Sequence, residues 1–168
     1  QKNLGPSGVT VVIIRQDMLE RPAGVVPSML KYSSYAKSNS LYNTPNCFGI
    51  YVIDLVLAWL EEEVGGLENM AALNRRKAQL LYQALDARPD FYRPTAERGS
   101  RSLMNVTFRL RDESLEAALV AEALEHGLGG LKGHRSVGGL RASLYNAVPL
   151  AAVEALAGFL ADFAQRKG

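Results

Sequence analysis

The sequence predicts an α/β protein that ends in a smaller α+β unit, and three features support this prediction. Residues 9–14 form a continuous, largely β-branched apolar run, which is typical of a buried strand. Residues 48–60 are apolar on nearly every side, as expected of a buried helix. Residues 104–110 and 140–145 alternate apolar with polar side chains, which is the pattern of half-buried strands, and a helical stretch follows each of them.

The composition excludes several classes of function. The 168 residues are 48% hydrophobic, which is enough for one core or two small ones. The net charge of +2 comes without a long basic run, so no nucleic-acid partner is predicted. Cys47 is the only cysteine, which excludes an intrachain disulfide and fits a reducing compartment such as the cytoplasm. Two histidines and one cysteine do not predict a metal site, and the apolar run at 48–60 is too short to span a membrane.

Lys2 stands just before a Gly-Pro-Ser-Gly turn at residues 5–8, which leads into the predicted strand. A lysine at this place is anchored by the sheet while its amine can reach a pocket, as a Schiff-base nucleophile requires. The position alone favours a simpler alternative, a solvated lysine near a chain end. Because the chain begins within this motif and without methionine, we expect it to be the C-terminal part of a longer protein.

The middle of the chain is predicted to hold a surface loop and the start of a helix. Pro22 interrupts the segment after the first strand, and the polar residues 28–43 indicate a loop. Thr44 and Pro45 have the form of an N-cap and a first helical position for the helix at 48–60.

A second helix is predicted over residues 67–87, after a break at Gly65 and Gly66. Arg75, Arg76 and Lys77 interrupt its apolar stripe, and a solvated face is expected for most of them. The stripe consists of Met70, Leu73, Leu80, Leu81, Ala84 and Leu85.

The C-terminal stretch predicts strand, helix, strand and helix in that order. The strand at 104–110 is followed by a helix at 114–125, with Gly127 just past its end. The strand at 140–145 is followed by an amphipathic helix that opens at Pro149. With antiparallel strands, this order makes a compact α+β unit.

Three separated motifs resemble the phosphoserine aminotransferases, which are pyridoxal-phosphate enzymes of fold type I in the class V aminotransferase family. The motifs are QKNLGPSG at 1–8, YNTP at 42–45 and KGHRSVGGLRASLYNA at 132–147. The resemblance implies the remainder of a large α/β domain over 1–72 and a small α+β domain with an antiparallel sheet over 73–168. It also implies a homodimer with shared active sites, built with an N-terminal half that this chain lacks.

The resemblance assigns pyridoxal 5′-phosphate to the first two motifs. It implies that Lys2 carries the cofactor and moves a proton at the substrate, and that Gln1 contacts the cofactor. It implies that Asn43 and Thr44 bind the phosphate of the cofactor held by the other subunit, since a helix N-terminus attracts anions. From spacing alone, simple helix capping is the better interpretation of Asn43 and Thr44.

The resemblance assigns the substrates to the third motif. It implies that Arg141 holds the substrate α-carboxylate, while His134 and Arg135 approach the substrate phosphate from the neighbouring subunit. The residues by themselves favour an exposed basic loop in surface salt bridges. The implied reaction moves the amino group of L-glutamate to 3-phosphohydroxypyruvate, giving O-phospho-L-serine and 2-oxoglutarate, and some relatives also serve pyridoxine biosynthesis.

Two alternatives remain at this point. One is a non-catalytic dimerisation or binding module of the same fold, although the presence of Lys2, Arg135 and Arg141 together argues against it. The other is a different fold-type I pyridoxal-phosphate enzyme, such as a small-amino-acid aminotransferase or a sulfur-transferring lyase. Because the remaining cofactor anchors would precede Gln1, this chain alone is expected to be inactive.

Overall fold

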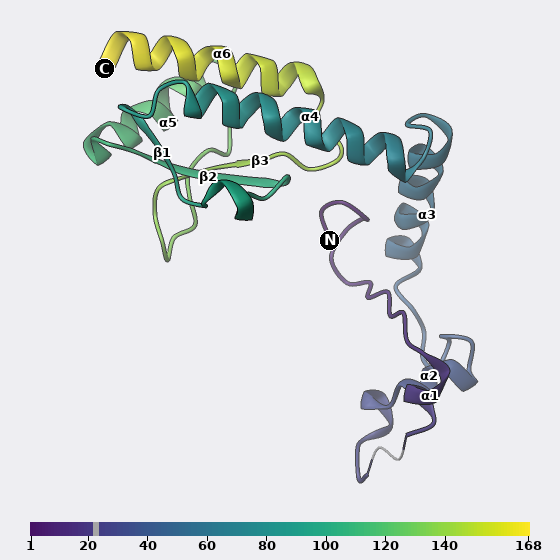
Figure 1. Cartoon of the computed structure of the whole chain (residues 1–168). Helices are drawn as coiled ribbons and strands as arrows, with labels where there is room; N and C mark the ends of the chain where they lie inside the picture. The colour runs from purple at the N-terminus through teal and green to yellow at the C-terminus, as the bar shows by residue number, and fades with distance from the viewer. Residues whose placement is uncertain (22–23) are drawn as a thin grey trace. The chain divides into compact units, whose positions relative to one another are not determined.

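A computed structural model describes residues 1–21 and 24–168, which divide into two compact units, 1–58 and 59–168 (Figure 1). The division falls within helix α3 (Cys47–Glu62). Pro22, predicted to interrupt the chain, lies outside the described residues. None of the described helices combines the length and apolar character that crossing a membrane requires. The domain boundary expected after residue 72 stays a prediction.

The second unit confirms the predicted small α+β fold. Its described residues form a three-stranded antiparallel sheet in the order β1 (Tyr92–Pro94), β2 (Asn105–Leu110) and β3 (Leu140–Ser143). Helices α4 (Leu67–Asp86), α5 (Glu116–Glu125) and α6 (Leu150–Lys167) accompany it, with short 3₁₀ turns η2 (Arg98–Ser100) and η3 (Glu113–Leu115). Strand β1 is not predicted from the sequence, because three residues that include a proline show no alternation. A strand of this kind is tolerated at a sheet edge.

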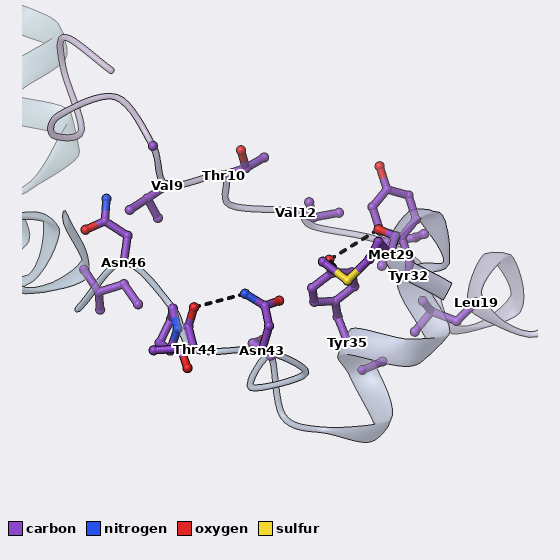
Figure 2. A pocket seen from close by; sticks show the side chains of 16 residues that line it. Val9, Thr10, Val12, Leu19, Met29, Tyr32, Tyr35, Asn43, Thr44 and Asn46 are labelled. Carbon is purple, nitrogen blue, oxygen red and sulfur yellow. Dashed lines mark hydrogen bonds between the residues drawn. The ribbon is translucent and has the colours of Figure 1, made fainter. Parts of the chain in front are cut away.

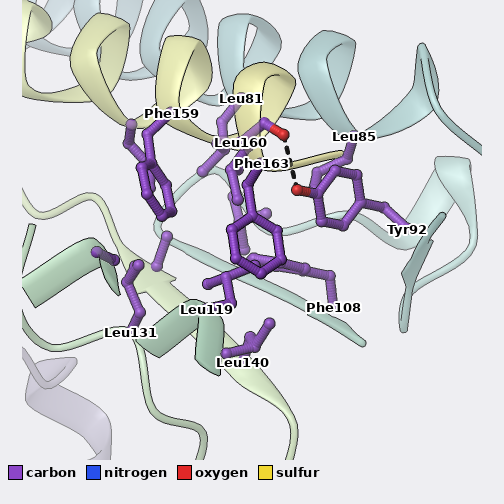
Figure 3. Packing of buried hydrophobic residues seen from close by; sticks show 14 of the residues in the cluster. Leu81, Leu85, Tyr92, Phe108, Leu119, Leu131, Leu140, Phe159, Leu160 and Phe163 are labelled. Atoms are coloured by element: carbon purple, nitrogen blue, oxygen red, sulfur yellow. Dashed lines mark hydrogen bonds between the residues drawn. The ribbon is translucent and has the colours of Figure 1, made fainter. Parts of the chain in front are cut away.

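The core of this unit lies between one face of the sheet and the helices (Figure 3). The alternation predicted for β2 is confirmed, since Val106, Phe108 and Leu110 are buried and the residues between them are half-buried. The Tyr92 hydroxyl donates a hydrogen bond of 2.8 Å to the Leu160 carbonyl of α6, and burial raises the pKa of Tyr92. The opposite face of the sheet is left for polar side chains.

Lys77 departs from its predicted place on a solvated face. Its side chain is 0% exposed, whereas Arg75 and Arg76 are exposed as predicted. The Lys77 ammonium donates to the carbonyls of Leu144, Tyr145 and Val148, at 3.3, 2.8 and 3.1 Å. Burial lowers the pKa of Lys77, while the three carbonyls favour its charged form. The ammonium therefore ties α4 to the turn that joins β3 to α6.

The predicted strand at 9–14 is not a strand in this structure, and the prediction of burial is wrong for these residues. The segment is not paired with any strand among the described residues, and Ile13 is 97% exposed. A strand requires a neighbour to accept its backbone hydrogen bonds, and an apolar run of this kind requires cover on both faces. The described chain supplies neither to residues 9–14.

Short helices occupy the rest of the first unit. They are α1 (Gln16–Leu19), η1 (Ser28–Leu30) and α2 (Tyr32–Lys37). The surface loop predicted at 28–43 therefore contains two short helical turns. The side chain of Tyr35 in α2 reaches back to η1, where its hydroxyl donates to the Met29 carbonyl at 3.3 Å.

Helix α3 begins at a different cap from the predicted one. The Asn46 side chain accepts a hydrogen bond of 3.0 Å from the Gly49 backbone N–H, and its own carbonyl accepts from Ile50. Asn46 is therefore the N-cap, and the prediction of Thr44 as cap with Pro45 as first helical residue is wrong. Asparagine is as good a cap as any residue, so the helix starts two residues later than the proline signal indicates.

Replacing Asn46 with alanine is expected to weaken the first turn of α3 by about 1 kcal/mol, which is about fivefold in local opening. Hydrogen exchange at the Gly49 amide measures this effect directly, because that amide loses its acceptor. Thr44→Ala is the matched control and should leave this exchange rate unchanged. Faster exchange with Thr44→Ala, but not with Asn46→Ala, would restore the original cap assignment.

Candidate active site

Lys2 lies in a tight N-terminal loop with an unusual backbone conformation. Its φ of 82° is in the left-handed region, and its backbone N–H donates to the Gly5 carbonyl at 3.1 Å. A Cβ added to Gly5 would lie 2.8 Å from Cγ1 of Ile53, so this loop rests directly on α3. A lysine in this conformation is strained by about 1–3 kcal/mol, and such strain is concentrated at ligand sites. Gln1 and Lys2 are both exposed.

A cavity of about 680 Å³ lies within the first unit (Figure 2). It is bordered by the extended segment after Gly8, by the α2 region and by the residues that precede α3. Asn43 and Thr44 both line it, and the Asn43 amide donates to the Thr44 carbonyl at 3.0 Å. Asn43 and Thr44, which are neighbours in sequence, thus line a cavity in the same unit as Lys2, although Lys2 is not among the residues that line it.

A close approach of backbone and side chain shapes one edge of this cavity. A Cβ added to Gly49 would lie 2.6 Å from Cγ2 of Val9 and 2.7 Å from Nδ2 of Asn46. Gly8 has a φ of 102°, which also favours glycine. The glycines at 8 and 49 therefore let the chain after the Lys2 loop run close to the start of α3.

The remaining predicted residues lie in the second unit, on or beside a loop at 132–139. A bridge between Lys132 and Leu140 closes this loop, and the Gly133 N–H donates to the Gly139 carbonyl at 2.8 Å. His134 and Arg135 are exposed, and Nδ1 of His134 lies 2.7 Å from the Ser136 hydroxyl. The structure therefore presents an imidazole and a guanidinium together to solvent.

Arg141 lies at the foot of the same loop, in β3. It is opposite Thr107 of β2 and is half-buried. Its Nε is buried and has no hydrogen-bond partner among the described residues. An unpaired buried donor of this kind costs about 1–3 kcal/mol, so an incoming anion that accepted this hydrogen bond would be stabilised. The Nε atoms of Arg101 and Arg109 are also buried and without a hydrogen-bond partner, although both of these arginines form salt bridges.

Sequence reasoning missed Arg109, which lies beside this loop. Arg109 is the next residue after Thr107 on the polar face of β2, and its side chain contacts the glycines at the loop base. The available signal was the alternation of the strand, which places residues 105, 107 and 109 on one face. What the pattern does not show is that Arg109, which pairs with Arg93 of β1 on one side, has the glycines at the loop base as its neighbours on the other side.

Comparisons with known proteins agree on one family. The model of the family described as "Aminotransferase class-V" matches residues 1–156. The chain is 59% identical over its whole length to a phosphoserine aminotransferase of Desulfatibacillum aliphaticivorans. It is 60% identical over 166 residues, or 99% of the chain, to that of Geobacillus kaustophilus. In both cases it spans 46% of the relative, a little under half of its length.

Solved structures give the same result. A phosphoserine aminotransferase from Bacillus circulans subsp. alkalophilus superposes with a TM-score of 0.93 at 54% identity, over 99% of this chain and 46% of that one. A phosphoserine aminotransferase with bound pyridoxal phosphate from Trichomonas vaginalis has a TM-score of 0.80 at 41% identity, over 88% of this chain and 42% of that one. These structural matches confirm the fold that the three sequence motifs predicted.

Proposed function

The chain belongs to the class-V aminotransferase family, and from this we propose that it is the C-terminal part of a phosphoserine aminotransferase. The full-length protein would move the amino group of L-glutamate to 3-phosphohydroxypyruvate, giving O-phospho-L-serine and 2-oxoglutarate. One observation carries the proposal: Lys2 has a left-handed backbone conformation, and it belongs to a chain that is similar along its whole length to these enzymes. The proposal includes a cytoplasmic location and, as a second role, pyridoxine biosynthesis.

The residues present fit pyridoxal 5′-phosphate. The aldehyde of the cofactor would react with the amine of Lys2. Its phosphate would accept hydrogen bonds from the neutral side chains of Asn43 and Thr44. Asn43 and Thr44 are exposed at a cavity, so their side chains are accessible to a phosphate group. When bound, pyridoxal phosphate supplies the electron sink for bond changes at the substrate Cα.

Each residue then has a separate task. Lys2 binds the cofactor and holds or moves a proton at the substrate Cα. Arg141 orients the α-carboxylate that both substrates share, because its buried Nε requires an acceptor. His134 and Arg135 bind the phosphate, which only one of the two substrates carries. Gln1, next to Lys2, contacts the cofactor.

A homodimer with shared active sites is part of the proposal. Helix α3 leaves several large apolar side chains uncovered within this chain, and Phe48 is 73% exposed. Such a surface requires cover from the rest of the protein or from a second subunit. In the proposed dimer, Asn43 and Thr44 bind the phosphate of the cofactor held by the other subunit, and His134 and Arg135 reach the neighbour's substrate. The chain without its N-terminal half is therefore proposed to be inactive.

Borohydride reduction of the full-length protein with pyridoxal phosphate tests the proposal. Reduction makes the link between a lysine amine and the cofactor permanent, and peptide mapping then identifies the lysine. The label is expected on Lys2 and absent from Lys37, an exposed lysine of α2 that serves as the internal control. Labelling elsewhere would contradict the proposal, and an unlabelled protein would favour a non-catalytic module. A labelled protein whose turnover did not depend on a phosphorylated keto acid would be a different enzyme of the same fold type.

A further inference from the structure

The two ends of the 132–139 loop contain three glycines, Gly133, Gly138 and Gly139, which we call the glycine base. A Cβ added to Gly133 would lie 2.0 Å from the Gly138 carbonyl oxygen, so the two arms of the loop touch through their backbones. Gly138 and Gly139 both have a φ of 69°, a conformation that side chains rarely adopt. The orientation of the loop therefore depends on these three glycines, which have no side chains that could stabilise it.

The side chain of Arg109 in β2 lies against two residues of the glycine base. A Cβ built on Gly138 would lie 3.0 Å from the Arg109 Nη2, and one built on Gly139 would lie 3.1 Å from its Nε. The guanidinium therefore lies in close contact with the backbone of both glycines. Because the pairing of β2 with β3 runs up to Phe108 and Leu140, this contact lies where the loop joins β3.

Two carboxylates hold Arg109 in this position. Its Nη1 donates to Glu113 at 2.9 Å, and its Nε lies 3.3 Å from Glu116. Glu116 is mostly buried and also accepts from the Leu110 backbone N–H at 3.4 Å. The guanidinium is thus paired with one carboxylate of η3 and one of α5, while its Nη2 and Nε lie next to Gly138 and Gly139.

We propose that Arg109 is a positioning residue that holds the His134–Arg135 loop in the orientation required for the phosphorylated substrate. This inference rests on the proposed function, since His134 and Arg135 are there the phosphate ligands. In this proposal Arg109 acts through the loop and not on the substrate, and Arg141, the proposed ligand of the carboxylate common to both substrates, is held separately by the pairing of β3 with β2. Loss of Arg109 should therefore affect only the substrate that carries a phosphate.

The test uses Arg109→Met in the full-length enzyme, with the Michaelis constants of both substrates measured separately. The KM for the phosphorylated substrate is expected to rise about tenfold, because small misplacements of binding groups have effects of this size. The KM for glutamate is expected to change less than about twofold. Arg109→Lys, which keeps the charge without the planar fork, should give an intermediate result and serves if the methionine variant does not fold.

Arg93→Met is the matched control. Arg93 lies directly opposite Arg109 in the sheet and also pairs with Glu113, at 3.5 Å, but it lies on the far side from the glycine base. It should leave both Michaelis constants unchanged. An equal rise for both substrates with Arg109→Met, or no change for either, would overturn the proposal, as would the same selective rise with Arg93→Met.

Hydrogen exchange separates this inference from the proposed function. The Gly138 amide donates to the His134 carbonyl at 2.8 Å, so its exchange rate reports the order of the loop. It should exchange faster in Arg109→Met than in the parent and in Arg93→Met. Faster exchange in a protein that does not use a phosphorylated substrate would refute the proposed function and leave the positioning role, whereas unchanged exchange would refute the positioning role alone.

Discussion

Lys2→Ala in the full-length protein is expected to reduce turnover by about 100-fold to 10,000-fold, the range that a positioned acid–base group contributes. On the proposed function, the variant loses both the covalent anchor of the cofactor and the amine that moves the proton. The loop should keep its shape, because it is held by the backbone hydrogen bond from Lys2 to Gly5 and by the contact of Gly5 with Ile53. Each half of the reaction is measured in a single turnover, with glutamate or with the phosphorylated substrate.

Two further variants sharpen this experiment. Lys2→Arg keeps a positive charge of similar reach, but a guanidinium stays protonated and cannot serve as the amine, so it should be as inactive as Lys2→Ala. Lys37→Ala removes an exposed lysine of the same unit and should leave turnover unchanged. Full activity of Lys2→Ala would show that another group performs the chemistry, and the function proposed for this chain would then be wrong.

Lys77→Met is expected to destabilise the protein by about 2–4 kcal/mol, since a hydrogen bond to a charged group contributes about 1.5–3 kcal/mol and three carbonyls lose the ammonium as a donor. Methionine fills most of the space of the lysine stem but donates nothing to Leu144, Tyr145 and Val148. Urea unfolding of the full-length protein gives the change in free energy, read from the midpoint at constant slope.

Arg76→Met is the control for Lys77→Met, because it removes an exposed cation from the adjacent position of α4. It should change the unfolding free energy by no more than about 0.5 kcal/mol. If Lys77→Met were equally harmless, the turn after β3 would be held by its other contacts. Those contacts include the backbone hydrogen bonds from Leu144 to Met104 and from Val148 to Tyr145.

Local patterns predicted the elements of the second unit well. The alternation in β2 and β3 and the apolar stripe of α4 were read correctly because each depends on the period of its own element. Element boundaries depend on more than residue type, as the start of α3 shows. Both Thr44 and Asn46 are suitable caps by residue type, and only the hydrogen bond from the Gly49 amide identifies Asn46.

Other features depend on partners distant in sequence, and no local pattern reveals them. The three carbonyls that bind Lys77 lie 67 to 71 residues further along the chain, so the burial of this lysine could not be read from a run of basic residues. The contact between Arg109 and the glycine base arises only when β2 pairs with β3. The residues at 9–14 suit a buried strand by type, yet a strand forms only where a neighbour accepts its backbone hydrogen bonds.

The sequence by itself determined the family of this chain and the antiparallel α+β unit, and it predicted which residues carry reactive or ligand-binding side chains. It did so because motifs and periodicities are properties of neighbouring residues. Only the tertiary structure decided which polar groups are left without a partner and which backbone positions are strained, such as the Nε of Arg141 and the φ of Lys2. Burial and strain result from contacts between distant segments, and those contacts exist only after the chain has folded.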